Sequence, residues 1–123
     1  MKIKKGKQGK CHINAFNVYK KHGLKIAVGF YVERLNNEIY SIPHIWNIDD
    51  DGYVVEPTEG DWDGEYYGKI VTKKYTSGGK LFDGELWPIY KYRLDTEEDL
   101  RNVVKELCLT KFKTYKNGNI ERN

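Results

Sequence analysis

Three residues in the first half of the chain have the side chains of a cysteine nucleophile, a general base and an orienting carboxylate. They are Cys11, His44 and Glu56. A thiolate attacks carbonyl carbons, and an imidazole takes the thiol proton and later protonates the leaving group. A carboxylate fixes the tautomer and orientation of that imidazole. The expected chemistry is cysteine-dependent acyl transfer, with Cys11 as nucleophile, His44 as general base and then acid, and Glu56 as the orienting carboxylate. It requires no cofactor.

Cys11 lies at the start of a predicted helix. Apolar residues mostly follow helical spacing over residues 11–21, and Gly23 stands where a C-terminal cap belongs. The N-terminus of a helix stabilises a thiolate through unpaired backbone amides and the macrodipole. We therefore expect Cys11 to be alkylated at mildly acidic pH well before Cys108, which falls on the apolar side of the last predicted helix and is expected in the core.

A predicted hairpin positions the other two residues. Residues 44–48 and 53–56 have strand composition, and the acidic, glycine-containing segment 49–52 favours a tight reversal between them. A register that sets Glu56 opposite His44, or diagonal to it, places both side chains on one face. Either arrangement is within reach of a glutamate side chain. A register shifted by one residue would separate them.

The elements around this hairpin complete an α+β prediction. The additional predicted elements are a hairpin with strands at 24–34 and 38–41, strands at 66–75 and 86–93, and a helix opened by a capping box at 96–99. Pro43 is expected to separate the strand at 38–41 from the next. We expect the N-terminal helix bearing Cys11 to pack on an antiparallel sheet that carries His44 and Glu56, and the C-terminal helix to cover the remaining apolar surface.

The composition is typical of one globular domain spanning residues 1–123. Its 123 residues suffice for a core, and 39% hydrophobic with 32% charged residues exclude a disordered chain. The net charge of +3 is concentrated in a basic arm at 1–8 and just beyond, and 114–123 form a polar tail. No apolar run reaches the roughly 20 residues of a membrane span, and no signal peptide is recognisable. We expect a cytoplasmic protein without a membrane partner or a disulfide.

Several short motifs, taken in order, resemble the transglutaminase-like and papain-like cysteine proteins. The motifs are Gly9-Lys-Cys11-His-Ile-Asn-Ala15, Gly29-Phe-Tyr-Val, His44-Ile-Trp46-Asn and Val55-Glu56-Pro57-Thr58. The resemblance covers the first half of the chain and implies an acyl-enzyme intermediate that passes to water or to an amine. It implies a protein, peptide or small amide or ester substrate. Glu56 departs from the aspartate usual in the family, and the interval from cysteine to histidine is short.

An oxyanion hole needs donors aimed at the developing charge, and the backbone amide of Cys11 with one side chain is the usual solution. Gln8 is the first candidate for that side chain and Asn14 the second. Trp46 follows His44 on the same strand and is a candidate to shield the ion pair from water, although a strand tryptophan is more often part of the core.

The residues leave a second class of function open. An inactive module with the same fold would bind a peptide, a small ligand or single-stranded nucleic acid, the last through the lysines of the arm and stacked tyrosines. No nucleic-acid motif accompanies those lysines, so the pattern argues against a nucleic-acid partner. His12 and His22 belong to no metal-binding motif, and we expect no metal.

Overall fold

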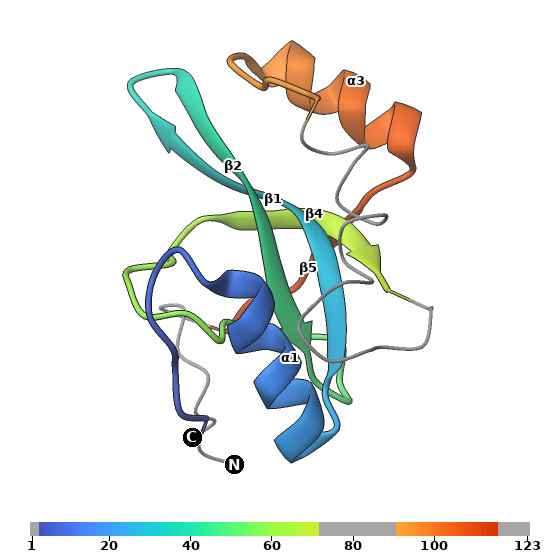
Figure 1. The fold of residues 1–123 in the computed structure, drawn as a ribbon. Coiled ribbons are helices and arrows are strands. Elements are labelled where there is room, and N and C mark those ends of the chain that lie inside the picture. Colours follow the sequence, from blue (N-terminus) through green and yellow to red (C-terminus); the bar gives the residue numbers. More distant parts are fainter. Residues whose placement is uncertain (1–2, 72–90, 116–123) are drawn as a thin grey trace.

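The computed structural model describes residues 3–71 and 91–115, which form an antiparallel sheet and two helices. In chain order the elements are α1 (Cys11–His22), β1 (Lys25–Leu35), β2 (Glu38–Ile48), β3 (Val54–Val55), β4 (Glu65–Ile70), α3 (Glu97–Leu107) and β5 (Thr110–Phe112). The five strands lie in the order β3-β2-β1-β4-β5. In Figure 1 the long β1–β2 hairpin crosses the molecule, with α1 toward one end and α3 toward the other. The α+β prediction is confirmed.

The β1–β2 hairpin forms where the sequence predicts it, with Asn36 and Asn37 at positive φ in the turn (51° and 70°). Asparagine tolerates this backbone region better than most residues. The predicted break at Pro43 is wrong, because β2 continues through it and pairs Pro43 with Phe30 of β1. Beyond the short β3, the outer edge of β2 has no strand partner within the described residues. A residue without an N–H is tolerated at such an edge.

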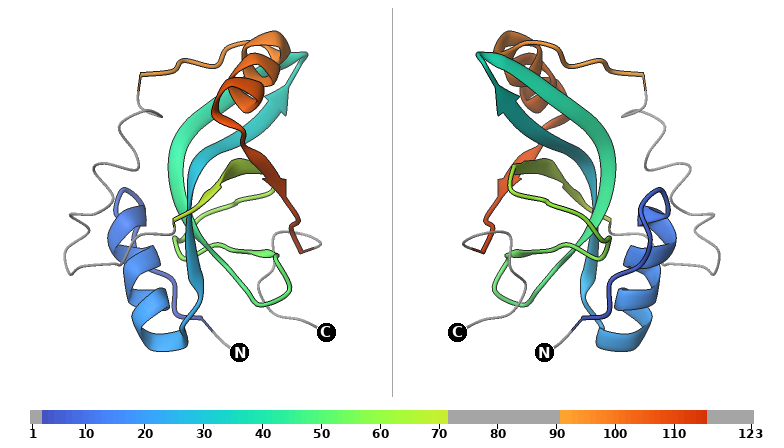
Figure 2. Two further views of the ribbon diagram at one scale, coloured as in Figure 1. Left: turned by 90° about the vertical axis from the view of Figure 1, so that its right-hand side faces the viewer. Right: turned by 90° about the vertical axis from the view of Figure 1, so that its left-hand side faces the viewer.

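The two faces of the sheet carry different cores. On one face, Val28, Phe30 and Ile45 pack with Ala15 of α1 and with apolar residues of α3. On the other face, which we call the aromatic face, the core includes Tyr31, Trp46 and Tyr66. The side views in Figure 2 show α1 as a layer beside the sheet. α1 therefore lies on the first of these faces, where Ala15 packs against β1 and β2.

One end of each helix follows a predicted capping signal. Gly23 caps α1 at φ 73°, and its N–H donates to the Tyr19 carbonyl. Thr96 and Asp99 form a complete capping box at the start of α3. Of the strand predicted at 66–75, β4 accounts for the part up to residue 70, and residues 72–75 lie outside the described residues. Of the strand predicted at 86–93, residues 86–90 also lie outside them, and 91–93 are not strand.

The described parts of the predicted arm and tail are anchored to the body. The N–H of Gly6 donates to the Pro57 carbonyl and the Glu59 N–H donates to the Gly6 carbonyl, both at 2.8 Å. The buried side chain of Ile3 joins a small cluster with α1 and β3. At the other end, the Tyr115 ring stacks on Tyr53 at a centroid distance of 4.6 Å. Across the residues that the structure describes, no helix is both long and apolar enough to cross a membrane.

Candidate active site

Cys11, His44 and Glu56 come from three separate elements and meet at one place. Cys11 is the first residue of α1, His44 lies in β2, and Glu56 directly follows β3. The β2–β3 ladder pairs Asn47 with Val55 and Ile48 with Val54. Continued by one position, this register places Glu56 across from the residue two after His44. Of the two predicted registers, which set Glu56 directly opposite His44 or diagonal to it, the structure has the diagonal one.

Both oxygens of the Glu56 carboxylate accept hydrogen bonds. Its Oε1 lies 2.8 Å from Nε2 of His44 and accepts a 2.8 Å hydrogen bond from the Tyr66 hydroxyl. Its Oε2 accepts the Thr58 N–H at 3.0 Å. His44 and Glu56 are each only 2% exposed. A buried carboxylate is tolerated when it is paired and hydrogen-bonded, so these three donors both permit its burial and fix the direction of the imidazole.

The other side of the imidazole faces the thiol. The Cys11 thiol lies close enough to the His44 imidazole to raise its pKa, and because Nε2 faces Glu56, Nδ1 is the nitrogen left for the sulfur. Burial lowers the pKa of His44, but the hydrogen bonds to Cys11 and Glu56 outweigh it and raise the pKa to about 9. At neutral pH the ring is therefore an imidazolium. A cation in this position stabilises a thiolate.

The N-terminus of α1 adds backbone donors at the same point. Its N-cap residue, Lys10, makes no side-chain capping hydrogen bond, and the first turn contains no acidic residue. The first amides of a helix have no intrahelical acceptor. Because the N-cap side chain does not occupy these amides, they and the macrodipole favour negative charge at Cys11.

Two tryptophans enclose the imidazole. Trp62 stacks on the His44 ring at a centroid distance of 4.3 Å and an interplanar angle of 15°. Its indole N–H donates to the Thr58 carbonyl at 2.9 Å, which fixes it to the loop that follows Glu56. Trp46 is fully buried and lies farther away, at 6.1 Å. Trp62 is thus the nearer shield, and an aromatic face beside an imidazolium also stabilises its charge.

The two oxyanion candidates are placed differently. Asn14 donates its amide to the Lys7 carbonyl at 2.9 Å and to the Thr58 hydroxyl at 3.0 Å. Both amide hydrogens are then used, so this side chain ties α1 to the loop carrying Glu56. The Gln8 amide lies over Gly60, where an added Cβ would be 2.7 Å from its nitrogen. Gln8 thus remains the candidate donor.

Sequence reasoning missed Tyr66 and Trp62. Tyr66 pairs with Tyr31 in the β1–β4 ladder, and both belong to the aromatic face. The hydroxyl of Tyr66 reaches Glu56 across the sheet, and burial together with the Glu56 charge raises its pKa, so it stays a neutral donor. The alternation of Tyr66 with Tyr67 across the two faces is the only sequence signal for it. Trp62 lies in a loop, where no periodicity marks its direction.

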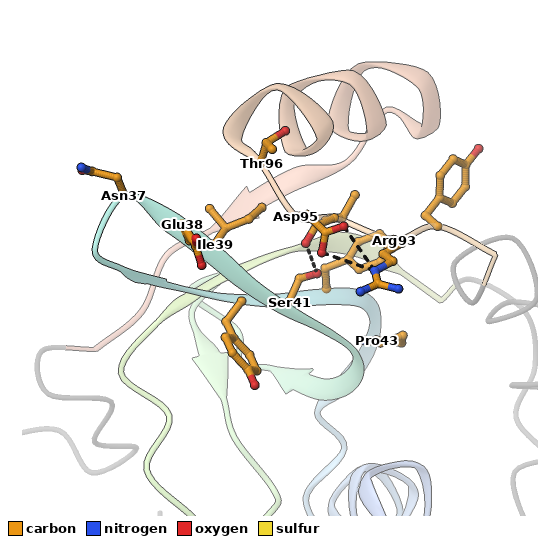
Figure 3. Close-up of a pocket in the computed structure, with 12 residues that line it drawn as sticks. Asn37, Glu38, Ile39, Ser41, Pro43, Arg93, Asp95 and Thr96 are labelled. Atoms are coloured by element: carbon orange, nitrogen blue, oxygen red, sulfur yellow. Dashed lines mark hydrogen bonds and ion pairs between the residues drawn. The ribbon is translucent and has the colours of Figure 1, made fainter.

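Away from these residues, a cavity of about 740 Å³ lies between the β1–β2 hairpin and the segment before α3 (Figure 3). Ser41 and Pro43 of β2 line it, and the Ser41 hydroxyl donates to the Leu94 carbonyl at 3.1 Å. Strand alternation places these two residues on the face opposite His44. No member of the candidate triad lines this cavity, so it is separate from the site.

Comparisons of the chain with models of protein families, with curated proteins and with solved structures gave no match.

Proposed function

We propose that this protein catalyses cysteine-dependent acyl transfer from an amide or ester, as a hydrolase or an acyltransferase of the transglutaminase-like kind. One observation carries the proposal. Side chains from the start of α1, from β2 and from the loop after β3 form a continuous chain of contacts from Cys11 through His44 to Glu56. A cysteine, a histidine and a carboxylate in that order are what nucleophilic thiol catalysis requires.

The first half-reaction forms a thioester. The Cys11 thiolate attacks the carbonyl carbon, a C–S bond forms, and the C=O π electrons move onto the oxygen. The Cys11 backbone N–H and the Gln8 amide are the proposed donors to that oxyanion. When the tetrahedral intermediate collapses, the bond to the leaving amine or alcohol breaks and the His44 imidazolium supplies its proton.

The second half-reaction regenerates the thiolate. Neutral His44 takes a proton from water or from an acceptor amine, which attacks the thioester carbonyl. Collapse of this second intermediate breaks the C–S bond, releasing an acid or a new amide and restoring the ion pair. Hydrolysis and transfer differ in this acceptor alone. Glu56 keeps Nδ1 of His44 directed at the sulfur throughout, and a reducing compartment such as the cytoplasm would keep the thiol competent.

The test is to trap the acyl-enzyme. Mixing the protein with an activated aryl ester and quenching in acid should leave one acyl group per chain, mapped by mass spectrometry to Cys11 and released by hydroxylamine. Cys11→Ala should abolish the adduct, and the matched variant Cys108→Ala should retain it. Acylation at Cys108 alone, or at lysines alone, would reject the proposal in favour of the inactive binding module.

A further inference from the structure

A groove begins beside the proposed catalytic residues and extends along the outer half of the β1–β2 hairpin. Its volume is about 350 Å³, and its lining residues are Gln8, Tyr31, Glu33, Leu35, Tyr40, Ile42, Asp61 and Trp62. Gln8 and Trp62 link it to the site, because Trp62 stacks on His44 and Gln8 lies against Gly60 in the same loop. The groove therefore adjoins the loop that carries Trp62, and Gln8, three residues before Cys11 in the chain, is its link to the start of α1.

The floor of this groove is apolar where a sheet surface is usually polar. Leu35, Tyr40 and Ile42 are 60%, 70% and 40% exposed. The opposite face of the same hairpin arm is buried, since Phe30 and Ile39 pack in the core that α3 covers. A sheet with one covered face normally presents polar side chains on the other. Clustered exposed apolar residues indicate a binding surface.

The charge of the groove is negative. Among the described residues, Glu33 and Asp61 are the two charged ones that line it, and no lysine, arginine or histidine does. Glu33 is held in place, because its Oε2 accepts the Tyr31 hydroxyl at 2.8 Å. The nearby Arg34 is engaged elsewhere, in ion pairs with Glu65 and Glu97. An apolar floor between two carboxylates is complementary to a large apolar side chain next to a cation.

We propose that this groove binds the segment of a polypeptide substrate adjacent to the reacting amide, and that it selects a large apolar residue followed by lysine or arginine. The proposal rests on the proposed function, because the groove has this role only if Cys11 reacts. The negative charge of the groove favours a basic peptide or protein segment as substrate and disfavours acidic segments. The groove therefore determines which amide reaches the thiolate, while the triad determines what happens to it.

The experiment uses three peptide probes that carry the same thiol-reactive acyloxymethyl ketone and differ in two recognition residues. The pairs of recognition residues are leucine with lysine, leucine with glutamate, and serine with lysine. The rate of Cys11 labelling is measured by intact mass, alongside the rate with iodoacetamide, which has no peptide part. The leucine-lysine probe should react about tenfold faster than either of the others, since exposed charge pairs and a single apolar contact each contribute modestly.

Two variants assign that selectivity to the groove. Glu33→Gln combined with Asp61→Asn should reduce the preference for lysine over glutamate to about twofold. Ile42→Ser should reduce the preference for leucine over serine. Glu98→Gln, which removes an exposed carboxylate on α3, is the matched control and should retain both preferences.

The outcomes that contradict the two proposals differ. Equal rates for the three probes, or selectivity that survives in the doubly substituted variant, would overturn the groove proposal if iodoacetamide still labels Cys11 rapidly at mildly acidic pH. Slow iodoacetamide labelling under those conditions would instead overturn the proposed function, and the groove proposal with it.

Discussion

The two cysteines of this chain lie at opposite kinds of helix end. Cys11 begins α1, is partly buried and contacts His44. Cys108 ends α3 as its C-cap, is exposed, and has a left-handed backbone at φ 54°. The first thiol adjoins backbone amides and an imidazolium, whereas the second adjoins carbonyl oxygens, which disfavour negative charge. The expectation of a core position for Cys108 is wrong, and the comparison teaches that the two thiols of one chain can have surroundings that favour and disfavour a thiolate.

The largest expected effect comes from removing the cation beside Cys11. A thiol with the ordinary pKa near 8.5 is about one part in a thousand thiolate at pH 5.5. His44→Ala should therefore slow alkylation of Cys11 at that pH by about a hundredfold, measured by mass spectrometry of iodoacetamide-treated protein. Cys108 provides an internal reference in the same sample, and its labelling should not change. Equal labelling rates for Cys11 and Cys108 in the unaltered protein would contradict the difference in reactivity between the two thiols.

The next effect concerns the protonation of His44. Its pKa of about 9 depends on hydrogen bonds to Cys11 and Glu56 that outweigh burial. Acylation that needs the imidazolium should decline as the pH rises through about 9, because the ring then loses its proton. In Cys11→Ala the pKa of His44 should fall toward the 6.5 of a free imidazole. NMR of the ring protons across the titration measures both values.

Cys108→Ala is the control for that titration. It should leave the His44 curve in place, because Cys108 does not contact the imidazole. A His44 pKa near 6.5 in the unaltered protein would contradict the ion pair.

A smaller effect is expected from the hydroxyl that supports Glu56. Tyr66→Phe removes one of three donors to a buried carboxylate and should lower the free energy of unfolding by about 2 kcal/mol. Urea denaturation monitored by circular dichroism measures this loss. Tyr67→Phe is a matched control in the adjacent position, since its hydroxyl donates to the partly exposed Glu65. Equal losses in the two variants would mean that Tyr66 does not support the site in particular.

The smallest effect lies at the other cysteine. Glycine adopts a left-handed backbone without the steric cost that Cys108 incurs, so Cys108→Gly should raise the free energy of unfolding by about 0.5–1 kcal/mol. Thermal unfolding followed by circular dichroism is sensitive enough to detect it. Alkylation of Cys11 should be unchanged, and a slower reaction there would indicate that the two helix ends are coupled.

The parts of the fold that were predictable from the sequence are those with local signals. Gly23 and the capping box at Thr96 mark helix ends through backbone conformations and side-chain bonds that few residues provide. The turn at Asn36 and the reversal before β3 follow from residues that tolerate tight turns. Because side chains alternate along strands, the second hairpin also placed His44 and Glu56 within reach of each other.

What could not be predicted depends on contacts between distant segments. Tyr66 reaches Glu56 because β4 lies beside β1, and the sequence contains no local mark of that neighbour. β5 is only three residues long and mostly exposed, so its composition has no strand pattern. The strand break predicted at Pro43 is wrong for the same reason, since a strand tolerates proline only where it lies at the edge of the sheet.

The bridge between Gly6 and Thr58 joins a segment made early in translation to one made later. The segment that leads into Cys11 leaves the ribosome before its backbone partners in residues 57–59 are translated. The contacts of Cys11 with His44 and of His44 with Glu56 therefore form only after the chain has been made through residue 56. On the proposed function, the thiol gains its base and its orienting carboxylate only when the two segments close on each other.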